Sequence, residues 1–350
     1  MACNQSNLTS GQMRVITPTN IKSSSLIGSR RLMVSNNPET LNIINFSVTR
    51  GTLWHDYVNT SSTTTLHRVF GWHLNNTGET IKIGLTVQNL SSTNTIELQS
   101  VKREKCSTNN SSQYITYVGQ HLAKGCLDGT LDTINPIYNR FGQSVGLIEA
   151  YYIPNGYLVG FLFEFSVVRY SGTGNLNYYI RTVTSKNTSE DLRIITSSPF
   201  SKSGPHPRGS WSQADIAGTT PIYTVGQTSS TSISNGLTDS LLNASTSYDN
   251  SNAVNNPGHF GTTYRVRIPV NNILGVAKNI RIRVNPRGGV YAGAAKISAG
   301  TYGIPVLNTT KPNAAQVMDY TANPGTTYAK FTVMHAGASN LPLAIYVTTI

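Results

Sequence analysis

The chain has 350 residues, a net charge of +12 and only 12% charged residues. Soluble proteins average about 25% charged residues; here Ser, Thr, Asn, Gly and Tyr take that share, which is typical of β-rich extracellular, capsid and fibre proteins. No apolar run approaches the roughly 18 residues of a membrane-spanning helix, so the sequence excludes such a helix.

Residues 1–30 are polar and lack hydrophobic periodicity, which predicts an extended N-terminal arm. The first ten residues have neither a basic segment nor an apolar stretch, so no secretory signal is expected. Cys106 and Cys126 are candidates for a disulfide, which would leave Cys3 on the arm for a cross-link between subunits. Three unpaired thiols are the alternative that the sequence leaves open.

Residues 31–198 predict an antiparallel β-sandwich, because short apolar runs recur between turn signals. In one run, TIKIGLTVQ, apolar and polar side chains alternate with the period of two that marks a half-buried strand. The predicted strands of this region include Ile43–Thr49, Thr80–Gln88, Tyr157–Val168 and Tyr178–Thr184.

Residues 199–260 are rich in Pro, Ser, Thr, Asn and Gly, which predicts a long connector between two domains. One short helix is predicted at Asp239–Ala244 (DSLLNA). The carboxylates of Asp215, Asp239 and Asp249 are candidate calcium ligands, although no EF-hand spacing accompanies them; ordinary turn residues are the alternative.

Residues 261–350 predict a second antiparallel β-sandwich of the jelly-roll or immunoglobulin-like kind. The turn between two of its strands contains Arg287, Gly288 and Gly289, and a Gly-Gly pair suits a tight turn that needs positive φ. The predicted strands are Thr262–Asn271, Asn279–Asn285, Gly289–Ile297, Thr301–Val306, Thr326–Met334 and Leu341–Thr348.

The sequence has no P-loop, HExxH, CxxC or nucleophile elbow, so no enzymatic activity is expected. Its fifteen carboxylates are scattered, and no pair is spaced for glycoside hydrolysis. The seven histidines are scattered as well, and His67 and His73 flank a predicted buried strand. We therefore expect no cofactor, apart from the calcium alternative.

Arg265 and Arg267 in YRVRI, and Arg281 and Arg283 in IRIRV, repeat with a period of two. Each pair therefore projects from one face of its strand, and four guanidinium groups would form a ladder if the two strands were neighbours. Such a face would attract an anionic cell-wall polymer or the acidic edge of another subunit. A solvated face is the alternative, and nucleic acid is not an expected partner, because residues 1–30 contain only three basic side chains.

Several segments resemble a family of secreted proteins from Gram-positive spore-formers that often carry a copper-amine-oxidase-like N-terminal stalk domain. The resemblance rests on Asn285–Ala294 (NPRGGVYAGA) and Ala338–Leu343 (ASNLPL), with weaker matches at Ser29–Glu39, Arg208–Asp215 and His259–Tyr264. The chain departs from the family because it has no stalk domain and no signal peptide. The resemblance implies a surface-associated β protein and supplies no catalytic residues.

These patterns favour a non-enzymatic, self-assembling subunit of a spore or cell-surface fibre or layer, a homo-oligomer in which the N-terminal arm contacts a neighbouring subunit. The expected location is extracellular or on the spore or cell surface. A binding module for cell-wall polymers or carbohydrates is one alternative, with the aromatic residues Tyr178, Tyr179 and Trp211 as candidates for glycan contact. A viral capsid protein is the other.

Overall fold

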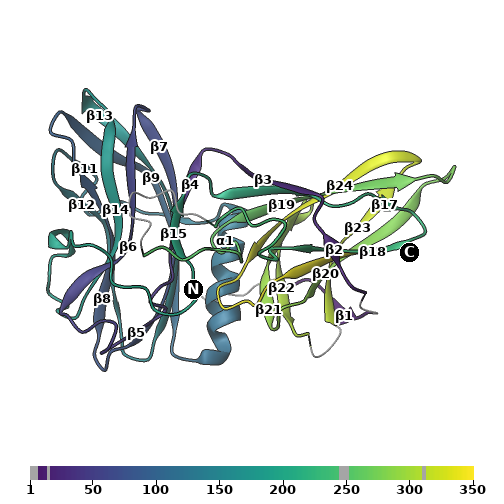
Figure 1. The fold of residues 1–350 in the computed structure, drawn as a ribbon, viewed down its shortest axis with the longest axis horizontal. Coiled ribbons are helices and arrows are strands. Elements are labelled where there is room, and N and C mark those ends of the chain that lie inside the picture. Colours follow the sequence, from purple (N-terminus) through teal and green to yellow (C-terminus); the bar gives the residue numbers. More distant parts are fainter. Residues whose placement is uncertain (1–6, 14–15, 244–251, 310–312) are drawn as a thin grey trace.

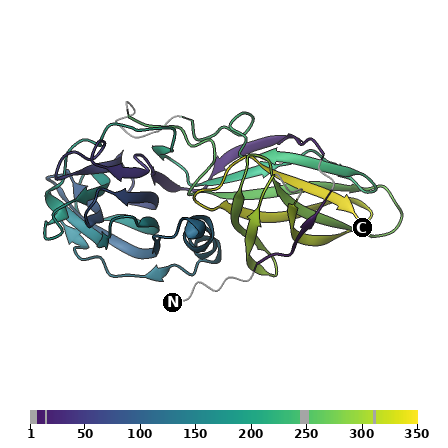
Figure 2. The ribbon, with the colours of Figure 1, turned by 90° about the horizontal axis from the view of Figure 1, so that it is seen from below.

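The computed structural model describes residues 7–13, 16–243, 252–309 and 313–350. The chain folds into two lobes, each built from two β-sheets, with the helix α1 (His121–Asp128) between them (Figure 1). The view from below shows the same arrangement, with α1 seen end-on at the junction of the lobes (Figure 2). The predicted all-β, sandwich-like class is confirmed.

The first lobe packs an eight-stranded sheet against a four-stranded sheet. Its core lies between the sheets, where the alternating side chains of β8, such as Ile83 and Leu85, are fully buried as their period of two predicts. The eight-stranded sheet has the order β10 (Asp132–Thr133), β9 (Asn94–Thr108), β13 (Leu158–Gly172), β7 (Thr64–Asn76), β4 (Arg30–Ser35) and β15 (Arg208–Trp211), with β11 (Arg140–Phe141) on β9 and β5 (Thr40–Asn42) on β7. The four-stranded sheet has the order β12 (Val145–Ile153), β8 (Ile81–Asn89), β14 (Leu176–Ser185) and β6 (Arg50–Thr60).

The second lobe packs a seven-stranded sheet against a six-stranded sheet around a separate apolar core. The seven-stranded sheet has the order β22 (Gly300–Leu307), β21 (Tyr291–Ile297), β24 (Gly325–His335), β19 (Thr263–Asn272), β16 (Asp215–Thr219) and β3 (Ser23–Ile27), with β17 (Tyr223–Thr224) on β19. The six-stranded sheet has the order β1 (Ser10–Gln12), β23 (Asn313–Ala322), β20 (Lys278–Pro286), β25 (Leu343–Thr349), β18 (Thr228–Ile233) and β2 (Thr19–Asn20).

Two local predictions are wrong. The segment Ile43–Thr49 is a turn rather than a strand, because the Asn42 side chain accepts hydrogen bonds from the main-chain N–H groups of Ile44 and Asn45. The described part of the predicted helix, residues 239–243, is also a turn. Among the described residues, the helical structure lies instead at 111–128 and 192–194, in η1 (Ser111–Gln113), η2 (Tyr114–Gln120), α1 and η3 (Leu192–Ile194).

The N-terminal segment differs most from its prediction. Its described residues do not extend away from the molecule: they add edge strands to the second lobe, β1 antiparallel to β23, β2 parallel to β18 and β3 antiparallel to β16. In this structure the segment therefore belongs to the chain's own sheets. These strands could not be predicted from the sequence, because edge strands need few buried apolar side chains and so leave no hydrophobic pattern.

The domain boundaries also differ from the predicted ones. The predicted connector contributes β15 to the first lobe and β16, β17 and β18 to the second, so the second sandwich is not built from residues 261–350 alone. Gly, Ser and Thr dominate these strands, and pairing with stronger strands overrides their low intrinsic preference.

A two-stranded ribbon crosses the junction. β3 and β4 follow each other with only Gly28 and Ser29 between them, and they pair antiparallel with β16 and β15 respectively. The Gln213 side chain donates to the main-chain oxygen of Gly28 (2.8 Å), which ties the two strands together at the crossing. The ribbon belongs to both lobes, so they share main-chain hydrogen bonds.

A third apolar cluster fills the junction itself. It combines Trp72 of the first lobe, Leu122 of α1 and Met334 of the second lobe, all at most 1% exposed. Gln120 in η2 donates from Nε2 to the main-chain oxygens of Ile304 (2.6 Å) and Gly293 (3.2 Å) in the second lobe. The helical segment is therefore a packed wedge between the sheets.

Arg68 joins the lobes electrostatically. It lies on β7, its side chain is 5% exposed, and its Nε donates to Oε1 of Glu164 on β13 (2.8 Å). Its Nη1 donates across the junction to Oδ1 of Asp215 (3.0 Å) and to the main-chain oxygen of Ala214 (3.1 Å). Asp215 also accepts from the Thr263 hydroxyl (2.6 Å), so one guanidinium fixes the start of β16.

Replacing Arg68 with Ala is expected to lower the free energy of unfolding by about 3 kcal/mol, because the partly buried carboxylates of Glu164 and Asp215 lose their nearest cation. Urea unfolding followed by tryptophan fluorescence measures the change. The matched control is Arg281→Ala, which removes a bidentate but exposed Arg–Asp pair with Asp319 and is expected to change stability little. An equal decrease in the free energy of unfolding in the two variants would contradict the role assigned to Arg68.

Candidate functional site

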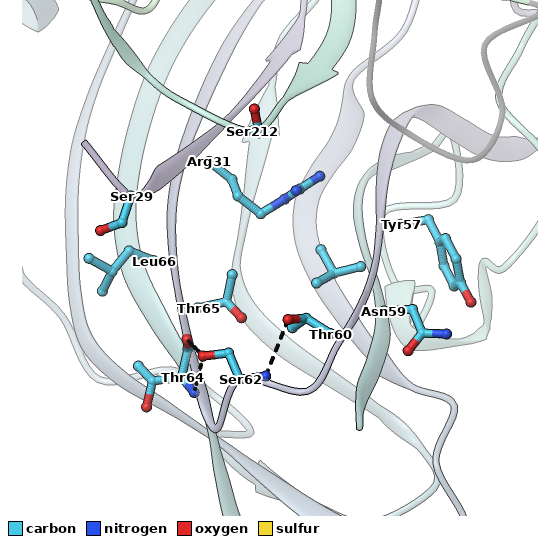
Figure 3. Close-up of a pocket in the computed structure, with 11 residues that line it drawn as sticks. Ser29, Arg31, Tyr57, Asn59, Thr60, Ser62, Thr64, Thr65, Leu66 and Ser212 are labelled. Atoms are coloured by element: carbon cyan, nitrogen blue, oxygen red, sulfur yellow. Dashed lines mark hydrogen bonds between the residues drawn. The ribbon is translucent and has the colours of Figure 1, made fainter. Parts of the chain in front are cut away.

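A groove of about 660 Å³ opens on the first lobe, at the loop that joins β6 to β7 (Figure 3). Most of its lining is neutral and polar, and Tyr57 and Leu66 add a ring and an aliphatic side chain. The polar lining includes the hydroxyl and amide side chains of Ser29, Asn59, Thr60, Ser62, Thr64 and Ser212.

An ionic pair joins Arg31, which lines the groove, to the buried carboxylate of Asp56. Arg31 donates from Nε to Oδ2 of Asp56 (2.9 Å) and from Nη2 to Oδ1 (2.8 Å), and the Asp56 side chain is fully buried. His67 lies 4.0 Å from the same carboxylate, and its Nε2 is 2.7 Å from the Tyr178 hydroxyl. Burial and the nearby charge of Arg31 hold the pKa of His67 well below its usual value, so His67 is neutral at physiological pH.

This arrangement suits hydrogen bonding to a neutral ligand better than acid–base chemistry. Arg31 and Tyr57 are the only ionisable side chains among the residues that line the groove, and the Arg31 charge is already paired. The hydroxyl of Ser62 donates to the main-chain oxygen of Thr64 (2.6 Å) and is not adjacent to a base. The lining residues therefore supply neither the activated nucleophile nor the positioned base that catalysis would need.

A second polar network is sealed inside the second lobe. The Ser234 hydroxyl lies 2.9 Å from Nδ1 of His259 and 2.8 Å from Nε2 of His335, whose Nδ1 is 2.9 Å from the Tyr291 hydroxyl. Asp239 accepts from the main-chain N–H of Ser234 (2.6 Å). All five side chains are at most 2% exposed, so a substrate cannot reach them and the network acts as a structural core.

The segments that carry the family resemblance meet at one turn of the second lobe. Gly289 has a φ of 140°, and a Cβ on Gly288 would lie 1.9 Å from the main-chain oxygen of Leu341. The main-chain N–H of Arg287 donates to the main-chain oxygen of Pro342 (3.0 Å), and the main-chain N–H of Asn340 donates to the main-chain oxygen of Val290 (2.8 Å). The turn thus holds NPRGG against SNLP by close main-chain contact.

The structure separates the four arginines of the predicted ladder. Arg265 and Arg267 lie on β19 in the seven-stranded sheet, whereas Arg281 and Arg283 lie on β20 in the six-stranded sheet. Arg281 is paired with Asp319, and Arg283 donates to the Thr348 hydroxyl (3.2 Å). A single four-arginine face does not form, because consecutive strands of a sandwich can belong to opposite sheets.

The cysteines do not form the predicted bridge. Cys106 on β9 and Cys126 on α1 are not joined by a disulfide, and Cys3 lies outside the described residues. Burial raises the pKa of Cys126 to about 11, so its thiol is unreactive at neutral pH. The disulfide between Cys106 and Cys126 was predicted from sequence separation, which carries no information on the distance between the side chains.

The proposed calcium ligands are not brought together. Asp215 is bonded to Arg68 and Thr263 at the junction, and Asp239 belongs to the sealed network of Ser234. Asp249 lies outside the described residues, and among those that are described no group of His, Cys, Asp or Glu is arranged to hold a metal ion.

The aromatic candidates for glycan contact are mostly core residues. Tyr178 and Trp211 are 0% and 2% exposed and cannot stack on a sugar, while Tyr179 is half-buried against Tyr57, with ring centroids 5.0 Å apart. The sequence reasoning missed Tyr57 and the Arg31–Asp56 pair. The only local signal was a carboxylate inside an apolar run, LWHDYV.

No protein-family model and no curated protein matches the chain. Among solved structures, the CUB1-EGF-CUB2 region of human MASP-1/3 is 6% identical and covers 87% of this chain and all of its own, with a TM-score of 0.19. The CBM22 tandem of Paenibacillus barcinonensis Xyn10C is 12% identical and covers 85% of this chain and 84% of its own, with a TM-score of 0.15. Such scores are too low to support any functional inference.

The helices within the described ranges are too short or too polar to cross a membrane.

His73 is expected to make the stability of the fold sensitive to acid. Its Nδ1–H donates to the main-chain oxygen of Pro38 (2.9 Å), its Nε2 accepts from Ser35 (3.1 Å), and burial lowers its pKa to about 4. The unfolded chain, with an ordinary histidine pKa of about 6.5, binds the proton first, so stability is lost as the pH falls from about 6.5 towards 4.

The free energy of unfolding decreases between pH 7.5 and pH 4, and we call this decrease the acid loss. His73→Asn is expected to make the acid loss smaller by about 3 kcal/mol, as measured by urea unfolding at the two pH values. The control is His206→Asn. Glu39 raises the pKa of His206, so this histidine stabilises the folded state at acid pH, whereas His73 destabilises it. Removing His206 takes away a contribution that is present at acid pH, so the acid loss becomes slightly larger. An unchanged acid loss in His73→Asn would show that the His73 imidazole is not a source of the acid sensitivity.

Proposed function

We propose that the protein is a non-enzymatic structural subunit that assembles by exchanging its N-terminal segment, residues 7–27, between copies. The observation that carries the proposal is that this segment supplies edge strands to both sheets of the second lobe while the chain continues into the first lobe. Exchange keeps the same strand pairs and changes only which molecule provides the segment.

The segment is held weakly, as exchange requires. β1 and β2 have three and two residues, all of them exposed, and β3 has five residues, none of them fully buried. Ile21 is the only described hydrophobic residue of the segment that is buried in the core, at 5% exposure. Local opening of a segment with so few buried contacts costs far less than global unfolding.

A hinge follows the segment directly. Gly28 has a φ of 81°, a conformation that glycine adopts without strain, and the next residue, Ser29, is exposed and leads into β4. A change of backbone angles at these two residues would redirect the whole segment, and the side-chain bond at the crossing that it would break is the one from Gln213 to Gly28. Short hinges next to a detachable edge element are the usual route to exchanged assemblies.

When the segment detaches, the sheet edges that it covered have to be paired again. Without β1, β2 and β3, the strands β23, β18 and β16 would present unpaired main-chain N–H and C=O groups. A second copy of residues 7–27 has the matching register. The low proportion of charged residues and the neutral lining of the groove support a structural role, at an extracellular, spore or cell surface.

A designed cysteine pair tests the exchange. Gln12 on β1 and Asn313 on β23 are direct cross-strand partners. In a Cys3→Ser background, Gln12→Cys with Asn313→Cys is expected to give monomers bridged internally at low concentration and disulfide-linked multimers on non-reducing gels at high concentration. Light scattering of the unmodified chain is expected to show a molar mass that increases with protein concentration.

The matched control is Asn279→Cys with Thr321→Cys, which are direct partners on β20 and β23. Neither of these strands belongs to the exchanged segment, so this pair should bridge only within one molecule at every concentration. The proposal is wrong if the designed pair at β1 also bridges only internally, or if the unmodified chain stays monomeric at high concentration.

A further inference from the structure

The outer face of the seven-stranded sheet carries an unusual set of charges. Arg265 and Arg267 point outward from β19, Lys330 points outward from the neighbouring strand β24, and all three side chains are exposed. Residues two apart on a strand lie roughly 7 Å from each other, and neighbouring strands lie about 4.8 Å apart. The three cations therefore form a compact triangle, which we call the basic face.

The basic face contains a like-charge pair that the fold alone does not explain. Arg267 lies directly opposite Lys330 in the antiparallel register, at the position where like charges destabilise a sheet. The Arg267 guanidinium lies over the Tyr328 ring at 3.8 Å, which orients the cation without neutralising its charge. An anion placed across the two strands would remove the repulsion.

The described surroundings of the basic face offer little acidic compensation. Asp215 lies 3.9 Å from Arg265, but it is already bonded to Arg68 and Thr263. Between Asn250 and Ile350 the sequence contains a single acidic residue, Asp319, which lies on the other sheet and pairs with Arg281. The face therefore keeps a positive potential.

Hydroxyl groups extend the basic face across the sheet. One cross-strand row continues from Arg267 to Thr219 on β16 and Ser23 on β3, and the next row continues from Arg265 to Ala217 and Ser25. On the other side, Thr332 lies opposite Arg265. Cations flanked by rows of hydroxyls match a sugar polymer that carries both acidic groups and free hydroxyls.

We propose that the basic face binds an anionic polysaccharide, through charge-assisted hydrogen bonds from Arg265, Arg267 and Lys330 to its acidic groups. Nucleic acid fits less well, because single strands need free aromatic faces for base stacking, whereas one face of Tyr328 is covered by Arg267. The three cations lie on β19 and β24, outside the exchanged segment, and only the flanking hydroxyls of Ser23 and Ser25 belong to it. An exchanged copy of the segment would supply the same two hydroxyls, so either proposal can fail without the other.

Binding to immobilised heparin, measured with the monomer at low concentration and at several salt concentrations, tests the proposal. Arg265→Gln with Arg267→Gln is expected to weaken binding about tenfold and to flatten its salt dependence. The matched control, Arg281→Gln with Arg283→Gln, makes the same chemical change at the same spacing on the opposite sheet and is expected to alter binding less than about twofold. Polygalacturonate, a neutral glucan and a single-stranded oligonucleotide serve as comparison ligands.

Several outcomes would overturn the proposal: no retention on heparin or polygalacturonate, equal weakening in the two double variants, or tighter binding to the oligonucleotide than to either acidic glycan. Retention on the neutral glucan at the same strength would also overturn it, since the charges would then be irrelevant.

A stability measurement checks the like-charge argument without relying on affinity. Lys330→Thr is expected to raise the Tm by about 1–3 °C, because it removes the repulsion with Arg267. The control is Lys278→Thr, whose partner across the strands is the uncharged Ala322, and its Tm should stay unchanged. Excess heparin should stabilise the unmodified chain more than the Lys330→Thr variant, and the reverse order would contradict the proposed contact.

Discussion

The guanidinium of Arg68 and the ribbon beside it determine how the two lobes are joined. One buried cation bonds Glu164 of the first lobe and Asp215 at the start of β16, at the point where the chain enters the second lobe. Such a group is stable only when all its partners are in place. In the structure, the ribbon, the helix wedge and the ionic contact are satisfied together at the junction.

The two lobes present different surfaces. The first lobe presents a groove lined mostly by neutral hydroxyl and amide groups, whose one cation, Arg31, is paired with the buried Asp56. The second lobe presents weakly held edge strands and a positive face. The features that point to partners thus gather on the second lobe. The histidines and carboxylates of the two buried networks are enclosed or paired, and they stabilise the interior.

The sequence could predict the strands whose side chains alternate strictly or are apolar throughout, such as β8 and β13, because burial of one or both faces leaves a local pattern. It could not predict β15 to β18, where pairing with distant strands outweighs a composition typical of loops. The contact between Arg68 and Asp215 joins residues far apart in the chain. The basic face could be predicted only in part. The period of two places Arg265 and Arg267 on one face of a strand, but the sheet pairing is needed to show that Lys330 lies beside them and that Arg281 and Arg283 lie on another sheet.

The path of the chain through the ribbon has a consequence for how such a molecule can be divided. The chain passes from the second lobe to the first between β3 and β4, returns between β15 and β16, and visits the first lobe again where Val254 bridges Arg208. The strands of the first lobe all lie between Arg30 and Trp211, whereas the strands of the second lobe are divided between residues 10–27 and 215–349. The second lobe therefore does not correspond to an uninterrupted stretch of the gene. Recombination of one continuous gene segment therefore cannot transplant the second lobe, because its first strands are encoded on the far side of the first lobe.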